Sequence, residues 1–193
     1  MHALAWLIER FNSSIYLFLL LQGSTYLLSW VVNTFRGEPE LANHEWYKRR
    51  LFYKIGAHSM YIEHQPNGHF LGGAWGYGKA RDWARFGLLH LRGGVWVDGT
   101  RILPEGWTER SHVPTPTNEY GRYSFHTWMD PRIGRKMYYA SGFRNQNVYV
   151  FPQDDLVVVR FAMPRPAAHP IYRQVPFLEG VLGCLGLNAT ASA

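Results

Sequence analysis

Apolar residues recur at helical spacing in several parts of the chain, and this pattern predicts the helices. Residues 24–36 show it between a capping serine and a terminating glycine. Residues 41–53 and 171–185 are predicted helices as well, the latter interrupted near its start by Pro176. A short helix is predicted to begin at Pro104, because proline is favoured in the first helical turn.

The clearest helical pattern covers residues 79–92. Arg81, Asp82 and Arg85 are predicted to face solvent. The opposite face is predicted to pack inward, and it consists of Ala80, Trp83, Ala84, Gly87, Leu88 and Leu91.

Aromatic and β-branched runs dominate the last third of the chain and predict strands. The runs are residues 121–129, 136–140, 147–151 and 156–162, with turn residues between them. They predict an antiparallel meander of three or four strands. The order of helices, sheet and closing helix predicts an α+β fold, in which helices pack on an antiparallel sheet.

Composition and charge narrow the class of protein. The chain has 193 residues and is 47% hydrophobic, so it can bury a core and is not disordered as a whole. Its net charge of +6 is spread out, apart from the run 48–50, and nucleic-acid-binding surfaces are more densely basic. We therefore expect no nucleic-acid partner. The single Cys184 stands in an apolar stretch, which predicts a buried thiol and excludes a disulfide within the chain.

The N-terminal region carries no charge from Phe11 to Phe35. A membrane helix needs about 20 predominantly apolar residues, but polar residues such as Asn12 and Gln22 interrupt this stretch. We expect a buried helix here, with membrane association through residues 11–35 as the alternative. Glu9 stands where a signal peptide should be positive, so there is no convincing signal peptide and the localisation stays open.

Two patterns resemble ligand sites without meeting their requirements. Gly73 and Gly78-Lys79 have the spacing of a phosphate-binding loop, but Ala80 replaces the Ser or Thr that binds Mg²⁺. Three histidines of one loop match no short metal-ligand motif: His58, His64 and His69. We therefore expect no cofactor and no metal.

The segment GYGKARDWARFGLLHLRGGVWVDGTRILPEGW, residues 76–107, resembles the serine β-lactamase-like hydrolases. That superfamily includes class C β-lactamases, penicillin-binding DD-peptidases and related esterases. The later runs 120–129 and 141–160 resemble its sheet strands, and residues 24–32 resemble the helix after its second active-site motif. The resemblance implies a partial β-lactamase/transpeptidase-like fold. Its C-terminal part would span residues 22–187, after a hydrophobic segment 1–21 and before a tail 188–193.

The chemistry of this family requires a nucleophilic Ser with a Lys three residues further on. No Ser in this chain has such a Lys; Ser141 has Arg144 there, and arginine cannot act as a base. Ala140-Ser141-Gly142 matches the family's Lys-Thr-Gly triplet in part. The resemblance therefore implies no catalytic residue and substrate-binding roles for Ser141, Gly142 and Asn145. The alternative is that Ser141 is an ordinary residue at the end of a strand.

Two functions remain open. The first is a truncated hydrolase, inactive alone, that would take a small amide or ester substrate only when a missing N-terminal part completes it. The second is a non-catalytic structural or binding subunit of a larger, possibly membrane-associated assembly. The second function would involve a protein partner or a homo-oligomer.

Overall fold

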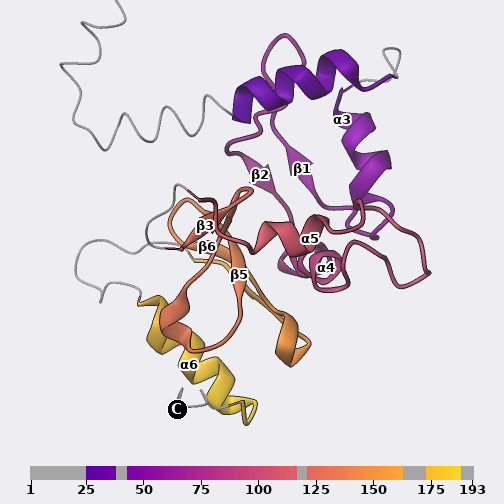
Figure 1. Cartoon of the computed structure of the whole chain (residues 1–193). Coiled ribbons are helices and arrows are strands. Elements are labelled where there is room, and N and C mark those ends of the chain that lie inside the picture. Colours follow the sequence, from indigo (N-terminus) through magenta and orange to yellow (C-terminus); the bar gives the residue numbers. More distant parts are fainter. Residues whose placement is uncertain (1–24, 38–42, 117–120, 163–172, 188–193) are drawn as a thin grey trace, which may run out of the picture. The chain divides into compact units, whose positions relative to one another are not determined.

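The computed structural model describes residues 25–37, 43–116, 121–162 and 173–187 (Figure 1). Backbone contacts divide the chain into two compact units. One unit comprises residues 1–50 and 59–78, and the other comprises residues 51–58 and 79–193.

The first unit holds helix 25–35, α3 (Asn43–Tyr47) and a two-stranded sheet of β1 (Tyr61–Ile62) and β2 (Gly76–Tyr77). A turn of π-helix, Lys48–Phe52, continues α3 into the second unit. The prediction of a helix over residues 41–53 is thus confirmed for residues 43–52.

Helix 25–35 confirms the predicted helix, but its orientation differs from the expected one. The Ser29 side chain is buried and donates a hydrogen bond of 2.7 Å to the Phe70 carbonyl. The apolar stripe lies on the outer side, where Leu27 is 64% and Phe35 76% exposed. The expectation of a buried helix is therefore wrong for these residues, because the inward face is the one that carries Ser29. Residues 11–24 lie outside the described residues.

None of the helices in the described part of the chain is both long and apolar enough to span a membrane.

The second unit contains a five-stranded antiparallel sheet in the order β3-β4-β5-β6-β7 (Figure 1). The strands are β3 (Tyr123–Ser124), β4 (Thr127–Trp128), β5 (Tyr138–Gly142), β6 (Gln146–Phe151) and β7 (Leu156–Arg160). This arrangement confirms the predicted meander. There is one strand more than expected, because residues 121–129 form a tight hairpin instead of a single strand.

Helices cover the two faces of this sheet. Helix α4 (Ala80–Leu91) packs on β6 and β7, and a Cβ atom added at Gly87 would lie 2.6 Å from Val157 Cγ1 and 2.9 Å from Val148 Cγ1. Only glycine permits this approach. Because neighbouring residues of a strand point to opposite faces, Tyr149 and Phe151 lie on the other face, under α6 (Gln174–Cys184).

The core of the second unit lies between the sheet and α6. Its six buried members are Ile133, Met137, Tyr149, Phe151, Leu178 and Leu182. Burying one such side chain stabilises the fold by about 2 kcal/mol. Pro176 lies in the first turn of α6 and does not interrupt it, because amide groups there have no partner within the helix.

Three further expectations require correction. Asp82 is buried, not solvent-facing, and its carboxylate pairs with Arg85. Cys184 is exposed, because it is the last residue of α6. The helix expected at Pro104 is α5 (Trp107–Ser111), which starts later because Gly106 adopts a left-handed φ of 73°.

His90 on α4 lies among aromatic rings. Its ring centroid is 4.8 Å from that of Phe86 and 6.4 Å from that of Tyr138, on which His112 also stacks at 5.1 Å. Nδ1 of His90 is buried and has no hydrogen-bond partner within the described residues. Burial lowers the pKa of His90 to about 4 and also lowers the pKa of His112.

We predict that the protein loses stability as the pH falls from 7 to 5. The unfolded chain protonates His90 near the ordinary histidine pKa of 6.5, whereas the folded chain does so only near a pKa of about 4, so the unfolded state binds more protons in this window. Linkage gives a loss of about 2 kcal/mol by pH 5 from His90 alone. Urea denaturation at pH 7 and at pH 5 measures the free energy of unfolding at each pH.

The variant His90→Phe should flatten this pH dependence, and His58→Phe, at an exposed position of the same unit, should leave it unchanged. An equal slope in wild type and His90→Phe would contradict the assignment.

Candidate functional site

The three predicted site residues lie at one end of the sheet, in the β5–β6 hairpin. Ser141 and Gly142 are the last residues of β5, paired with Asn147 and Gln146. Asn145 lies in the turn between the two strands, and all three predicted residues are exposed.

The turn has a strained backbone for its sequence. Arg144 and Asn145 both adopt left-handed φ angles, 61° and 65°. The turn has three residues, Phe143, Arg144 and Asn145, because Gly142 pairs with Gln146, and a left-handed φ in such a loop favours glycine or asparagine. The guanidinium of Arg144 lies 5.0 Å from the centroid of the exposed Phe143 ring.

Hydrogen bonds from β7 and from the residues after it hold this turn. Arg160 Nη1 donates a hydrogen bond of 2.7 Å to the Asn145 carbonyl. The Gln146 side-chain amide makes two bonds to the backbone of Ala162: its Oε1 accepts from the amide at 2.9 Å, and its Nε2 donates to the carbonyl. These contacts connect the turn to β7 and to Ala162, which lies two residues after the end of that strand.

Strand register extends the site beyond the predicted residues. Ser141 pairs with Asn147, and Asn147 pairs with Arg160 on β7. Antiparallel partners share a face of the sheet, so these three side chains form one polar row across three strands. Neither Asn147 nor Arg160 was predicted as a site residue. The alternation of each strand places them on this face, but their pairing with Ser141 depends on the register.

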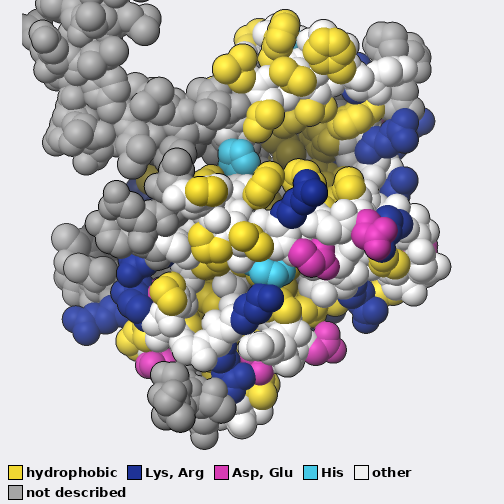
Figure 2. Space-filling model, in the orientation of Figure 1, with side chains coloured by type: hydrophobic (Ala, Val, Ile, Leu, Met, Phe, Trp, Pro, Cys, Tyr) yellow, Lys and Arg dark blue, Asp and Glu magenta, His cyan; other side chains and the backbone are white. Residues whose placement is uncertain are grey.

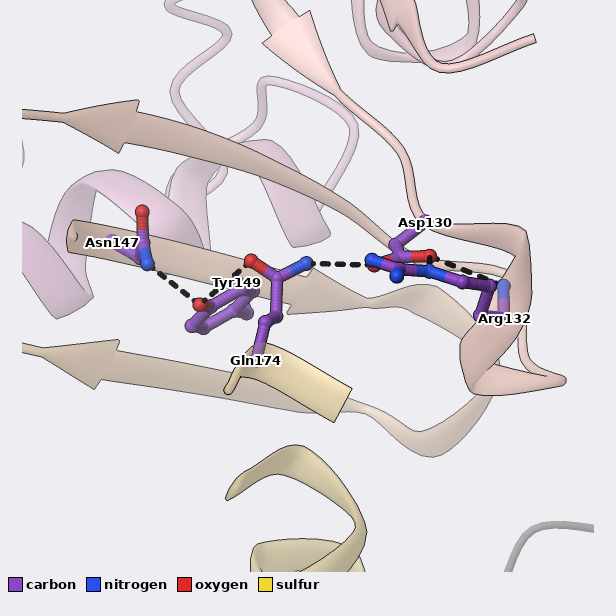
Figure 3. Close-up of polar contacts among 5 residues, drawn as sticks. All are labelled: Asp130, Arg132, Asn147, Tyr149 and Gln174. Atoms are coloured by element: carbon purple, nitrogen blue, oxygen red, sulfur yellow. Dashed lines mark hydrogen bonds and ion pairs between the residues drawn. The ribbon is translucent and has the colours of Figure 1, made fainter. Parts of the chain in front are cut away.

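A series of polar contacts continues from this row, and its first bond is buried (Figure 3). Asn147 Nδ2 donates to Tyr149 Oη at 2.6 Å, and Tyr149 Oη donates to Gln174 Oε1 at 3.3 Å. Gln174 Nε2 donates to Asp130 Oδ2 at 3.1 Å, and Arg132 binds both carboxylate oxygens, at 2.8 and 2.6 Å. These hydrogen bonds connect α6 to β6 and to the loop after β4.

The polar groups at the two ends of this series of hydrogen bonds differ in how well they are paired. Burial raises the pKa of Asp130, but the hydrogen bonds and charge of Arg132, together with the charge of Arg122, outweigh it and hold that pKa below its ordinary value. At the other end, Asn147 is 1% exposed and its Oδ1 has no partner in the part of the chain that the structure describes. Figure 3 shows this oxygen directed away from Tyr149.

This arrangement can bind a polar group, and it offers no evident means of activating Ser141. The Ser141 hydroxyl is exposed, and no hydrogen bond to it is found within residues 121–162 or the other described ranges. A Cβ atom at Gly142 would lie 3.3 Å from the Gln146 carbonyl oxygen, so glycine permits the close approach of the two strands at this end of the hairpin.

Metal ligands are likewise lacking among the described residues, where no cluster of three His, Cys, Asp or Glu side chains could hold an ion. His64 stacks on Tyr47 with ring centroids 5.6 Å apart, which is a packing role.

A comparison with solved structures found chains that are similar to this one. A protein assigned as a 6-aminohexanoate-dimer hydrolase from Bacillus anthracis is 24% identical, with a TM-score of 0.67 over 86% of this chain. This chain spans 44% of the length of that structure. A protein assigned as a β-lactamase from Bacteroides dorei is 11% identical over 61% of this chain, with a TM-score of 0.46.

The likeness to the first structure confirms the predicted fold, an α+β arrangement shared with part of a β-lactamase-like hydrolase. No family model matches the chain, and no curated protein matches it.

We predict that Arg144→Gly stabilises the protein by about 1 kcal/mol, because glycine tolerates the left-handed φ of this turn. Thermal unfolding of the purified variant measures the gain. The same exchange at Arg81, an exposed position of α4, should destabilise by a similar amount, since glycine is unfavourable within a helix. A loss of stability in both variants would show that the turn is not strained.

Proposed function

We propose that residues 22–187 form the C-terminal part of a β-lactamase-like amide or ester hydrolase and that they bind substrate without supplying the nucleophile. One observation carries the proposal: the exposed end of β5, Ser141-Gly142, lies beside a turn that Arg160 contacts, in a sheet whose fold matches part of a solved hydrolase structure.

The proposed binding mode follows from the groups at this end of β5. The Ser141 hydroxyl and the Asn145 side-chain amide can both donate to a carbonyl or carboxylate oxygen of a substrate. Because Gly142 has no side chain, a substrate can come close to the strand backbone.

The substrate class in this proposal is a small amide or ester. The structural neighbour from Bacillus anthracis bears the name of a 6-aminohexanoate-dimer hydrolase, and an amide bond joins the two units of such a dimer. Ser141 has Arg144, not a lysine, three residues further on, and a guanidinium stays protonated and cannot act as the base. The chain alone should therefore not be acylated.

We predict that a fluorophosphonate or a fluorescent β-lactam leaves the purified chain unlabelled, because no base activates a serine. Intact-mass spectrometry detects a covalent adduct directly. The Ser141→Ala variant serves as the matched control, since it would lose any adduct carried by that hydroxyl. A stoichiometric adduct on wild type that is absent from Ser141→Ala would overturn the proposal.

One observation favours the second function, a non-catalytic subunit. Apolar side chains gather on the outer side of helix 25–35 (Figure 2), and the exposed members are Leu27, Leu28, Trp30, Val31 and Phe35. A continuous apolar patch is typical of a surface that binds a protein or a membrane.

We predict that the double variant Leu27→Gln/Phe35→Gln weakens binding of the dye ANS, because both side chains are more than half exposed. Val97→Gln, at a 61% exposed position of the second unit, is the control for removing one isolated apolar side chain. If the double variant binds as much dye as wild type, the apolar side chains of helix 25–35 do not form the surface that binds the dye.

A further inference from the structure

The segment between β1 and β2 contains a tight turn with the sequence Gln65-Pro66-Asn67-Gly68. The Gly68 amide donates a hydrogen bond of 2.8 Å to the Gln65 carbonyl, and the Gln65 amide donates one of 2.8 Å to the His69 carbonyl. Gly68 adopts a left-handed φ of 82°. Proline at the second position of the turn and a left-handed glycine at the fourth are typical of such a loop, so the turn fits its sequence.

Asn67 lies at the tip of this turn and is exposed. Its Oδ1 accepts a hydrogen bond of 3.1 Å from the His69 amide, so the side chain lies beside the backbone that follows it. Asn67 is the only asparagine of the sequence that precedes a glycine. Because Gly68 has no Cβ atom, no side chain shields its backbone nitrogen from the Asn67 amide group.

We propose that Asn67 is a modification site, at which the side-chain amide converts to a carboxylate through a cyclic imide, without an enzyme. The Gly68 nitrogen loses its proton and forms a bond to Asn67 Cγ, and the bond from Cγ to Nδ2 breaks, so that ammonia leaves. Water then adds to one of the two imide carbonyl carbons and leaves aspartate or isoaspartate at position 67. The net reaction consumes one water and replaces an amide by a carboxylate.

The hydrogen bonds of the turn control the rate of this reaction. The N–H group that must lose its proton is bonded to the Gln65 carbonyl, and the bond from His69 restrains the Asn67 side chain. Both bonds must break before the imide can form. An exposed turn opens locally without unfolding of the rest of the unit, so the reaction proceeds in the folded protein, but more slowly than in the unfolded chain.

The isoaspartate product changes the hairpin as well as its charge. Its backbone is longer by one carbon atom, in a loop that the antiparallel bridge between His64 and Phe70 closes. The Phe70 carbonyl also accepts the hydrogen bond from Ser29 that holds helix 25–35. The modification therefore acts on the backbone on which this contact depends.

Intact-mass spectrometry tests the proposal on the full chain during storage in mildly alkaline buffer. We expect a gain of about 1 Da per molecule, because the reaction replaces an amide group by a carboxyl group. Peptide mapping should locate the gain at Asn67. The reaction should be about thirtyfold slower than in the same chain unfolded in urea, because two hydrogen bonds of ordinary net strength must break first.

Asn67→Gln is the matched control, because attack on the longer side chain requires a less favourable six-membered ring, and the variant should show no gain. Asn145 is a control within the same chain, because it is also exposed but precedes Gln146, whose side chain shields the backbone nitrogen. It should stay unmodified. Pro66→Ala should speed the reaction about threefold in the folded chain and leave the rate in urea unchanged, since proline presets the conformation of the turn.

A folded chain that gains no mass would overturn the proposal. A gain that persists in Asn67→Gln would overturn it too, because the reaction would then take place at another residue. Equal rates in the folded and the unfolded chain would contradict the role of the turn. None of these measurements involves a substrate, so the outcome is independent of the hydrolase assignment.

Discussion

The second unit depends on the burial of β6 on both of its faces. Val148 and Val150 point toward α4, and Tyr149 and Phe151 point toward α6, with none of the four more than 5% exposed. A strand covered on two sides has a fixed register, because a slip by one residue would exchange the two sets of side chains. The helices are thereby positioned relative to the strand, and the hairpin at its start is positioned with them.

The position of the candidate site follows from this strand. The β5–β6 turn extends directly from β6, and its backbone is held by Arg160 and Gln146. The turn tolerates two left-handed residues because contacts on both sides determine its path. A binding surface formed in this way loses little conformational freedom when a ligand arrives.

The sequence predicted local structure better than it predicted which side of an element is buried. Periodicity placed α4 to within a residue at each end, and β-branched runs located β6 and β7. Periodicity also found the apolar stripe of helix 25–35, but it cannot tell whether such a stripe faces the protein or solvent. Burial of Asp82 was missed for a related reason, since periodicity does not show that Arg85, one turn away, pairs with its carboxylate.

The site was predicted in part. Ser141, Gly142 and Asn145 are close in sequence, so a family resemblance could identify them together. Asn147 and Arg160 join them only through cross-strand register, which depends on the pairing of β5, β6 and β7. Single-sequence patterns contain no direct record of which residues pair across a sheet.

The unsatisfied oxygen of Asn147 has a consequence for where the molecule opens first. Within the described ranges this oxygen has no donor, and a buried acceptor of that kind costs about 1–3 kcal/mol, so the strand end near it is held less firmly than the core around Tyr149. Hydrogen exchange through partial opening would be fastest at this end of β6. A bound molecule that donates an N–H group to that oxygen would remove this free-energy cost. Such a molecule would therefore slow the partial opening of β6 through which it reaches the oxygen.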